Sequence, residues 1–349
     1  MFQSVSSLQN IKTENKKRNF EERASHLPII QSLPLVAKIE VTNRCNLQCI
    51  MCRQETWKQS IKDLDFNLFK ELEVIFPTLL SAYLYGIGEV LTYPYTMEMF
   101  DYLLSFEINV GILTNGILIN NEMGEEWVEK GLYKLSISID GATRYTYEKI
   151  RRGASYDRLF ANISMINQLK RKYNVQRPII TFNFVVMRDN IQELPDVVDM
   201  ASLYGVEEVI VSDLIVFFDT MREQSVSYDD VLCKESFYEA EIRAKRNNLK
   251  LFLPVPYRFQ KNLKIKSDDK VNPTVINSCT EPWSSFWLTS GGIVTPCCYW
   301  MKPMGDLKRN DFLTIWNNSH YQHLRKKVNT EWRNTLCRRC AIAGMEKRE

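Results

Sequence analysis

The chain has 349 residues, which is enough for one large domain and a smaller one. Its hydrophobic content of 45% and charged content of 25% are ordinary for a globular protein, and its net charge of +3 argues against nucleic acid as an obligate partner. No hydrophobic run is long enough to span a membrane, and the polar N-terminus does not resemble a secretory signal. Nine cysteines, clustered at two places, do not form a secreted disulfide framework, so we expect a cytoplasmic protein that binds metal.

Strand-like and helix-like segments alternate from residue 37 to about residue 215, which predicts parallel β/α units. The preceding extension, residues 1–36, contains a mixed run of charges at 12–23 that predicts a solvated segment. The six expected strands lie at residues 37–41, 79–85, 108–114, 133–139, 179–187 and 206–214. Amphipathic helices are expected between them at residues 67–76, 96–106, 122–130, 156–173 and 191–204.

The regular alternation predicts a first α/β domain over residues 37–225. A helix at 228–247, a short strand at 249–255 and a lysine-rich loop then predict a bridge over residues 226–275. Cysteines, tryptophans and glycines accumulate in residues 276–349, where no β/α alternation continues, so we expect a separate small domain there.

Three cysteines, Cys45, Cys49 and Cys52, follow the first expected strand in a Cys-x3-Cys-x2-Cys pattern. Three thiolates can hold three irons of a [4Fe–4S] cluster and leave the fourth iron open to another molecule. A zinc site is the competing interpretation, but zinc sites usually use paired x2 spacings and the first gap here is x3. The spacing therefore favours an iron–sulfur cluster with one open iron.

The cysteine motif and the strand ends that follow it resemble the radical S-adenosylmethionine (radical SAM) superfamily. The resemblance implies a partial (β/α)6 TIM barrel in which SAM chelates the open iron through its amino and carboxylate groups. It also implies that the reduced cluster cleaves SAM to a 5′-deoxyadenosyl radical, which takes a hydrogen atom from an unactivated C–H bond. A reducing partner such as flavodoxin or ferredoxin is then required. In β/α barrels the chemistry lies at the C-terminal ends of the strands.

The resemblance implies SAM contacts at the second strand end. Within YGIGEVLTYP, Gly88 and Glu89 match a Gly-Gly-Glu-Pro-like segment that holds the SAM ammonium, whereas Ile87 and Val90 depart from it. Glycine lets the backbone approach a ligand closely, and a carboxylate suits an ammonium group. A glycine-rich turn after a strand is also common for packing reasons alone.

Three further strand ends complete the implied SAM site. The third ends in LTNG, which contains Asn115, and the fourth in SISIDG, followed by YEKIRRG. By resemblance, Ser138 and one of Arg151 or Arg152 hold the SAM carboxylate, a task that suits an arginine fork. Asn183 on the fifth strand is a candidate for the ribose. From the residues alone, the Asp-Gly pair also fits a simple turn and the arginines a solvated helix end.

The last domain carries a second cysteine set, namely Cys279, then Gly292-x4-Cys297, then Cys337-x2-Cys340. Four cysteines can equally build a structural zinc site. The Cys-x12-Gly-x4-Cys opening resembles the SPASM domain, in the shortened, twitch-like form that holds one auxiliary [4Fe–4S] cluster. By resemblance, the four cysteines are its ligands. Saturated ligation would make this cluster an electron relay, whereas an open position would make it a substrate anchor, and the count of four favours the relay.

Two cysteines remain outside these sets. Spare thiols such as Cys233 and Cys298 are often small buried hydrophobes, although Cys298 is also an alternative ligand to Cys297. By resemblance to enzymes with this type of domain, Cys298 facing a substrate radical can donate a hydrogen atom, which would make the protein an epimerase. Otherwise the auxiliary cluster takes an electron and the outcome is a dehydrogenation or a cross-link. We favour the oxidation.

The substrate class is open between a small molecule, such as a sugar or aminocyclitol, and a peptide, in natural-product or peptide modification. Many peptide-modifying relatives carry an added N-terminal domain for leader recognition, and about 36 residues before the first strand are too few for it, which favours a small molecule slightly. A non-catalytic zinc-binding interaction protein is the remaining alternative. It explains both cysteine groups but not Glu89, Ser138 and Asp140 at successive strand ends.

Overall fold

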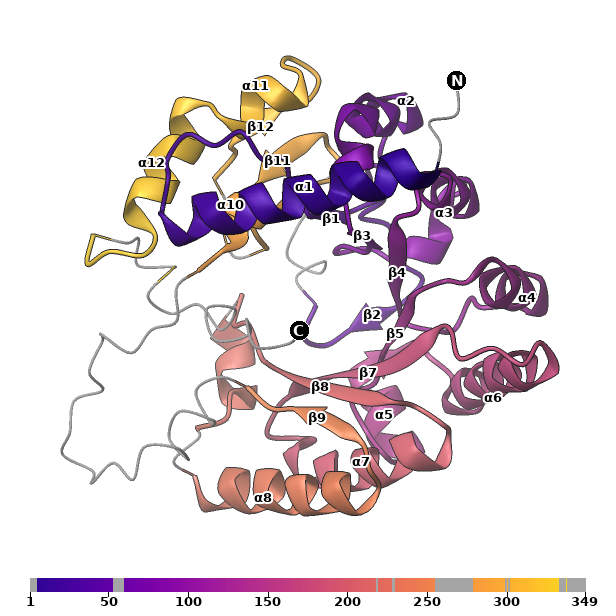
Figure 1. The fold of residues 1–349 in the computed structure, drawn as a ribbon. Helices are drawn as coiled ribbons and strands as arrows, with labels where there is room; N and C mark the ends of the chain where they lie inside the picture. Colours follow the sequence, from indigo (N-terminus) through magenta and orange to yellow (C-terminus); the bar gives the residue numbers. More distant parts are fainter. Residues whose placement is uncertain are drawn as a thin grey trace. The chain divides into compact units, whose positions relative to one another are not determined.

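The structure is a computed structural model that describes residues 5–52, 60–217, 219–227, 230–254, 279–298, 300, 302–332 and 337. The chain divides into two compact units. The first unit comprises Met1–Arg44, Ile61–Val110 and Asp269–Glu349, and the second comprises Cys45–Ser60 and Gly111–Asp268. Both units contain parallel strands connected by helices, as the alternation in the sequence predicts (Figure 1).

The second unit is built on five parallel strands in the order β4–β5–β7–β8–β9. β4 begins at the end of the first unit. Isoleucine, valine and phenylalanine are frequent in these strands, and β-branched and aromatic residues suit a pleated, buried sheet. The bounds are β4 (Asn109–Thr114), β5 (Lys134–Ser138), β7 (Ile179–Val186), β8 (Glu208–Asp213) and β9 (Lys250–Phe252).

Helices alternate with these strands, and α4 packs beside α6 and α7 beside α8 (Figure 1). Asn120, Ser155 and Asp230 each accept a backbone hydrogen bond as the N-cap of α4, α6 and α8. Helix α4 ends at Gly131, whose φ of +79° favours glycine. The helix bounds are α4 (Asn121–Lys130), α5 (Arg144–Ile150), α6 (Tyr156–Lys172), η4 (Ile191–Glu193), α7 (Leu194–Leu203), η5 (Asp219–Gln224) and α8 (Val231–Arg246).

One face of this sheet is polar. Ser138 of β5 and Asn183 of β7 are register partners, so their side chains lie on the same face near the C-terminal ends of the strands. Nearer the N-terminal ends, Glu208 accepts hydrogen bonds from Lys134 and from Thr181, whose Oγ1 lies 3.2 Å from Glu208 Oε2. Buried charges are normally paired in this way. The charges at one end of the face are thus already satisfied, while the opposite end carries Ser138 and Asn183.

The first unit contains strands in the order β12–β11–β10–β1–β3. β10, β1 and β3 are parallel, whereas β10, β11 and β12 form antiparallel pairs. The strand bounds are β1 (Val36–Ile39), β3 (Ser81–Leu84), β10 (Ser285–Leu288), β11 (Ile293–Thr295) and β12 (Gly305–Asp306). The helix bounds are α1 (Val5–Ala24), α2 (Phe66–Lys70), η2 (Glu71–Thr78), η3 (Val90–Thr92), α3 (Thr96–Leu104), α10 (Glu281–Ser284), α11 (Phe312–Trp316) and α12 (Ser319–Lys327).

A buried arginine ties the last helices of this unit to its other parts. Arg325 of α12 is 1% exposed. Its guanidinium donates to the carbonyl oxygens of Pro282 at 2.9 Å, Pro28 at 3.2 Å and Trp316 at 2.9 Å. Burial lowers the pKa of Arg325 to about 10. These contacts bring sequence-distant segments together within one unit.

The expectation of a solvated N-terminal segment holds for most residues of 12–23, which are exposed, but not for three of them. Residues 12–23 lie within α1, and three of their polar side chains are buried because each satisfies backbone groups of other segments. Lys12 Nζ donates to the carbonyl oxygens of residues 106 and 107, at 2.9 Å and 2.6 Å. Asn19 Nδ2 donates to the carbonyl oxygen of Trp283 at 2.6 Å, and Glu22 accepts the backbone N–H groups of residues 31 and 32.

The expected strands and helices are otherwise present, with boundaries that differ by a few residues. The expectation that no β/α element follows residue 276 is wrong in one respect, because β10 pairs in parallel with β1. The segment predicted as a bridge also contributes β9 to the sheet of the second unit. The proposed domain boundaries remain predictions.

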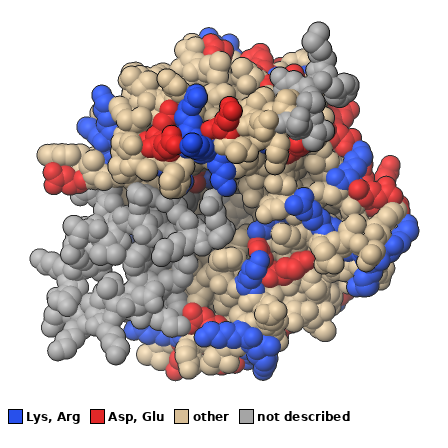
Figure 2. All heavy atoms as spheres, viewed as in Figure 1, with Lys and Arg blue, Asp and Glu red and all other residues tan. Residues whose placement is uncertain are grey.

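On the face that Figure 2 shows, Lys and Arg side chains are interspersed with Asp and Glu side chains. This distribution agrees with the small net charge of +3. Among the helices of the described residues, none combines the length and the apolar character that a membrane crossing needs.

Candidate cluster and cofactor sites

The Cys-x3-Cys-x2-Cys loop lies in the second unit and turns back on itself. The thiol of Cys49 is buried, whereas Cys45 and Cys52 are half-buried. The N–H of Leu47 donates to Cys45 Sγ at 3.4 Å, and the N–H of Cys52 donates to the carbonyl oxygen of Cys49 at 3.0 Å. Within the described ranges, no three His, Cys, Asp or Glu side chains converge on a single metal ion. A cubane cluster does not need such convergence, because each thiolate binds a different iron.

A short antiparallel ladder holds this loop. Strand β2 (Gln48–Cys49) pairs with β6 (Arg151–Arg152), which places Cys49 directly opposite Arg151. The N–H of Ile50 donates to the carbonyl oxygen of Ile150 at 3.0 Å and extends the pairing. The ladder thus fixes the middle cysteine against the segment that follows α5.

Asp140 connects the same ladder to the sheet. Its carboxylate is fully buried, lies 2.7 Å from an Arg151 nitrogen and accepts the N–H of Val185 at 2.8 Å. A second Arg151 nitrogen lies 3.9 Å from Cys49 Sγ. Burial disfavours the arginine charge, but the Asp140 carboxylate raises the pKa of Arg151 above its ordinary value. Burial raises the pKa of the Cys49 thiol to about 12, and the Arg151 guanidinium opposes that increase.

The predicted SAM residue Asn115 also touches the cysteine loop. Its Nδ2 donates to Asn46 Oδ1 at 2.8 Å, and its Oδ1 accepts the N–H of Ile117 at 3.0 Å. Asn46 follows Cys45 directly in the sequence. In this structure Asn115 therefore supports the loop, and its predicted contact with SAM stays a prediction.

Ser138 and Asn183 form the part of the second unit that best fits a polar ligand. The two residues are register partners, and both are half-buried. Asn183 Nδ2 is buried and has no hydrogen-bond partner among the residues that the structure describes. An unsatisfied buried polar group costs about 1–3 kcal/mol, so an acceptor from a ligand would stabilise this site. Ribose hydroxyls and a carboxylate, as in SAM, suit a hydroxyl and an amide side by side.

Gly88 and Glu89 belong to the first unit. A Cβ atom at Gly88 would lie 2.4 Å from the carbonyl oxygens of Thr42 and Arg44, so only glycine fits there. The N–H of Glu89 donates to the Arg44 carbonyl oxygen at 2.7 Å, and its buried carboxylate accepts the N–H of Leu91 at 3.2 Å. The motif therefore packs on the residue that precedes Cys45. This close approach was not readable from the sequence.

The two candidate arginines differ in their surroundings. Arg151 is buried beside Asp140, whereas Arg152 is exposed and pairs through its backbone with Gln48. The choice between them as the SAM carboxylate ligand remains a prediction.

The auxiliary cysteines lie in the first unit. The side chain of Asn329 clamps Cys279, accepting its N–H at 2.7 Å and donating to its carbonyl oxygen at 3.0 Å. The carbonyl oxygen of Cys297 accepts the hydroxyl of Thr295 and the N–H of Trp300, each at 3.3 Å. Cys337 is half-buried, and Cys340 lies outside the described residues.

Cys298 is exposed, unlike its half-buried neighbour Cys297. The pKa of Tyr85 is raised well above its ordinary value, mainly by burial and secondly by the Cys298 thiol. Burial would lower the pKa of Lys38, but its ion pair with Glu281 and the two thiols raise it. Cys298 is therefore close to side chains of β1 and of the segment after β3. Cys233 is buried in α8 and fits the packing interpretation.

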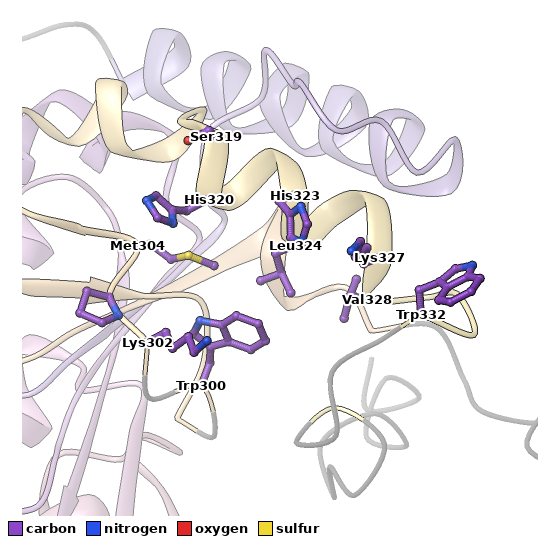
Figure 3. A pocket seen from close by; sticks show the side chains of 11 residues that line it. Trp300, Lys302, Met304, Ser319, His320, His323, Leu324, Lys327, Val328 and Trp332 are labelled. Atoms are coloured by element: carbon purple, nitrogen blue, oxygen red, sulfur yellow. The ribbon is translucent and has the colours of Figure 1, made fainter.

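A cavity of about 560 Å³ lies next to the Cys297 turn, since Trp300 forms part of its wall. Figure 3 shows His320 and His323 projecting from α12 towards it, with Met304 and Trp300 across from them. The described residues that line it include two lysines, two histidines and two tryptophans but no acidic side chain. Such a lining suits an anionic ligand or partner.

Family models match two regions of the chain, and each region contains one of the two cysteine groups. The family model of the radical SAM superfamily matches residues 39–201, and that of the SPASM iron–sulfur cluster-binding domain matches residues 279–341. The chain is 24% identical over 312 residues to the tungsten-containing aldehyde ferredoxin oxidoreductase cofactor-modifying protein of Pyrococcus furiosus, covering 82% of each chain. It is 23% identical over 320 residues to the AdoMet-dependent heme synthase of Methanosarcina barkeri, covering 87% of this chain and 88% of the relative.

Among solved structures, Streptococcus suis SuiB bound to S-adenosylmethionine has a similar fold. The TM-score is 0.69 at 15% identity, covering 96% of this chain and 79% of SuiB. The chain belongs to the radical SAM superfamily and has a C-terminal SPASM-type domain. It is a radical SAM enzyme with SAM and two [4Fe–4S] clusters as its cofactors, and the predicted fold class is confirmed.

Proposed function

We propose that this enzyme oxidises its substrate by two electrons, as a dehydrogenation or a cross-link. Bound SAM and the reduced cluster would supply a radical that removes one hydrogen atom from a substrate C–H bond. The substrate then loses a second electron to the auxiliary cluster and a proton to solvent or a base. The hydrogen atom leaves in 5′-deoxyadenosine, so the atoms and electrons balance.

The unsatisfied Asn183 amide beside Ser138 is the observation that supports the SAM site of this proposal. A ligand there would lie at the C-terminal ends of parallel strands, where β/α enzymes place their chemistry. In the same unit, Cys45, Cys49 and Cys52 would each bind one iron. We assign the SAM ribose to Asn183 and its carboxylate to Ser138 with Arg152 or the remaining donor of Arg151. Gly88 and Glu89 would receive the ammonium.

Saturated ligation of the auxiliary cluster supports oxidation rather than substrate anchoring. Cys279, Cys297, Cys337 and Cys340 supply four thiolates for four irons, which leaves no iron open. Protein contacts hold two of these cysteines, Cys279 through Asn329 and Cys297 through the turn to Trp300. A cluster held in this way exchanges electrons without binding the substrate.

A small molecule is the substrate class that we favour, with a peptide as the alternative. Two relatives that match over more than four fifths of both chains are named for modifying a tungsten-enzyme cofactor and for synthesising heme. SuiB has been solved with its precursor peptide SuiA, and for this reason we retain a peptide as the alternative substrate.

The electron donor that fits the cavity is a small acidic protein of the flavodoxin or ferredoxin class. The cavity lies next to Cys297, and its rim carries Lys302 and Lys327 without an acidic side chain among the described residues that line it. Charge complementarity of this kind accelerates encounter more than it increases affinity.

One observation favours a second outcome, epimerisation. Cys298 is exposed beside a proposed cluster ligand, so its thiol is accessible to a substrate radical. An S–H bond is weaker than most C–H bonds, which allows hydrogen transfer to the radical. The product would then keep the oxidation state of the substrate, and the thiyl radical left on Cys298 would take one electron from the auxiliary cluster and one proton from solvent.

A screen with deuterated candidate substrates tests the proposal and separates the two outcomes. We expect deuterium in 5′-deoxyadenosine, a product two electrons more oxidised, and full activity in Cys298→Ala. A product of unchanged oxidation state that gains one deuterium from D2O, with loss of net turnover in Cys298→Ala, would establish the epimerase instead.

A further inference from the structure

The guanidinium of Arg151 contacts side chains of the protein itself, although the position of this residue resembles that of a SAM ligand. Its side chain is 9% exposed, and one terminal nitrogen lies 2.7 Å from the Asp140 carboxylate. The other terminal nitrogen donates to Cys49 Sγ at 3.9 Å. Nε has no hydrogen-bond partner among the described residues. Two of the three guanidinium nitrogens are therefore committed to Asp140 and Cys49.

Three contacts fix this orientation without any bound group. The backbones of Arg151 and Cys49 are opposite each other in the β2–β6 ladder. Asp140 accepts the N–H of Val185 at 2.8 Å through its carboxylate, and its carbonyl oxygen accepts Asn190 Nδ2 at 3.1 Å. Because the carboxylate is held by the sheet, it can hold the arginine in turn. The donor to Cys49 is thus preorganised.

We propose that Arg151 is a positioning residue that donates to the Cys49 thiolate and raises the reduction potential of the SAM-binding cluster. Asp140 acts as the buried counter-ion that limits this effect. The proposal rests on the proposed cluster at Cys45, Cys49 and Cys52. Hydrogen bonds to the cluster sulfurs and the net charge nearby set the potential of an iron–sulfur cluster. A positive donor stabilises the reduced form, since that form carries one more negative charge.

The guanidinium suits this role better than an ammonium group. It stays protonated in proteins and presents several donors in a rigid fork, so it can serve a carboxylate and a sulfur at once. A lysine at the same position keeps the positive charge for Asp140 but cannot hold both partners. Arg151→Lys therefore removes the donor to sulfur with the least change in charge.

The decisive measurement is an anaerobic redox titration of the reconstituted two-cluster enzyme without SAM, followed by EPR. The cluster that binds SAM is identified by the change in its EPR signal when SAM is added afterwards. We expect a more negative midpoint for this cluster in Arg151→Lys, with unchanged iron content and an unchanged midpoint of the auxiliary cluster. Arg144→Lys changes an exposed arginine at the start of the preceding helix α5, so it is the matched control and should leave both midpoints unchanged.

A double variant that removes both buried charges separates the loss of the donor from a folding defect, because it leaves no uncompensated charge. In Asp140→Asn with Arg151→Met, both buried charges are removed together and the donor to Cys49 is lost, because methionine has no N–H donor in its side chain, so the midpoint should again fall. The single variant Asp140→Asn should shift it in the opposite direction, because the arginine charge is then uncompensated.

An unchanged midpoint in both Arg151 variants, or loss of the SAM-binding cluster from both, would overturn the proposal. These outcomes are distinct from a failure of the proposed function. That failure would appear in the enzyme with native Arg151, as a cluster that persists without Cys45, Cys49 and Cys52.

Discussion

The two cysteine groups are held by different means. The Cys45–Cys52 loop is fastened by a strand ladder, by Asn115 and by a buried ion pair between Asp140 and Arg151. The auxiliary group relies on single polar contacts, such as the clamp of Asn329 on Cys279, and borders an open cavity of about 560 Å³. The difference teaches that the first cysteine group is held by several contacts within its unit, whereas the second lies beside an accessible cavity.

The largest expected effect concerns the auxiliary group. Cys337→Ala or Cys340→Ala removes one of four thiolates, so iron should fall from about eight to about four per chain, the content of one cluster. Substrate turnover should stop, while SAM cleavage uncoupled from product formation persists. Iron and sulfide analysis with product quantification measures both effects. Iron content equal to that of the wild type in both variants would show that the four-cysteine assignment is incorrect.

The cavity beside the auxiliary group gives the next effect. Lys302→Glu with Lys327→Glu reverses its charge, so the rate of reduction by an acidic flavodoxin should fall about tenfold at low ionic strength. Reduction by dithionite should not change. The control, Lys308→Glu with Arg309→Glu, reverses two exposed charges outside the cavity lining. Equal slowing by the two double variants would remove the cavity as the docking position.

A smaller effect is expected at the SAM site of the first group. Asn183→Ala removes one hydrogen bond to the ribose, which corresponds to about 0.5–1.5 kcal/mol and roughly a 3- to 10-fold weaker SAM affinity. Asn167→Ala is the control, because Asn167 donates to the carbonyl oxygen of Tyr204 on the outer side of the unit. Equilibrium binding of SAM to the reconstituted protein measures the change. An affinity equal to that of the wild type would place the ribose elsewhere.

The sequence predicted the strands and the cysteine motifs because both follow local patterns. Alternating apolar segments locate β1, β3, β4, β5, β7 and β8 to within a few residues. The ion pair between Asp140 and Arg151 could not be predicted in this way, since it depends on how the segment after β5 packs against the segment after α5. The same applies to Gly88, whose requirement comes from the carbonyl oxygens of Thr42 and Arg44.

The N-terminal helix departs from the sequence-based expectation at single residues. Most of the charged side chains at 12–23 are exposed as expected, yet Lys12 and Glu22 are buried because they satisfy backbone groups of other segments. Composition alone does not distinguish a charged side chain that faces water from one that forms hydrogen bonds with the backbone of another segment. The parallel pairing of β10 with β1 was missed because the two strands lie far apart in the sequence, and such a pairing leaves no local pattern.

The central claim is that Cys45, Cys49 and Cys52 hold the cluster that cleaves SAM. The most direct test is 5′-deoxyadenosine formation with dithionite after anaerobic reconstitution, compared between the wild type and the triple Cys→Ala variant. The account predicts about eight irons and clear product in the wild type, and about four irons and no product in the variant. Product formation by the triple variant would contradict the account.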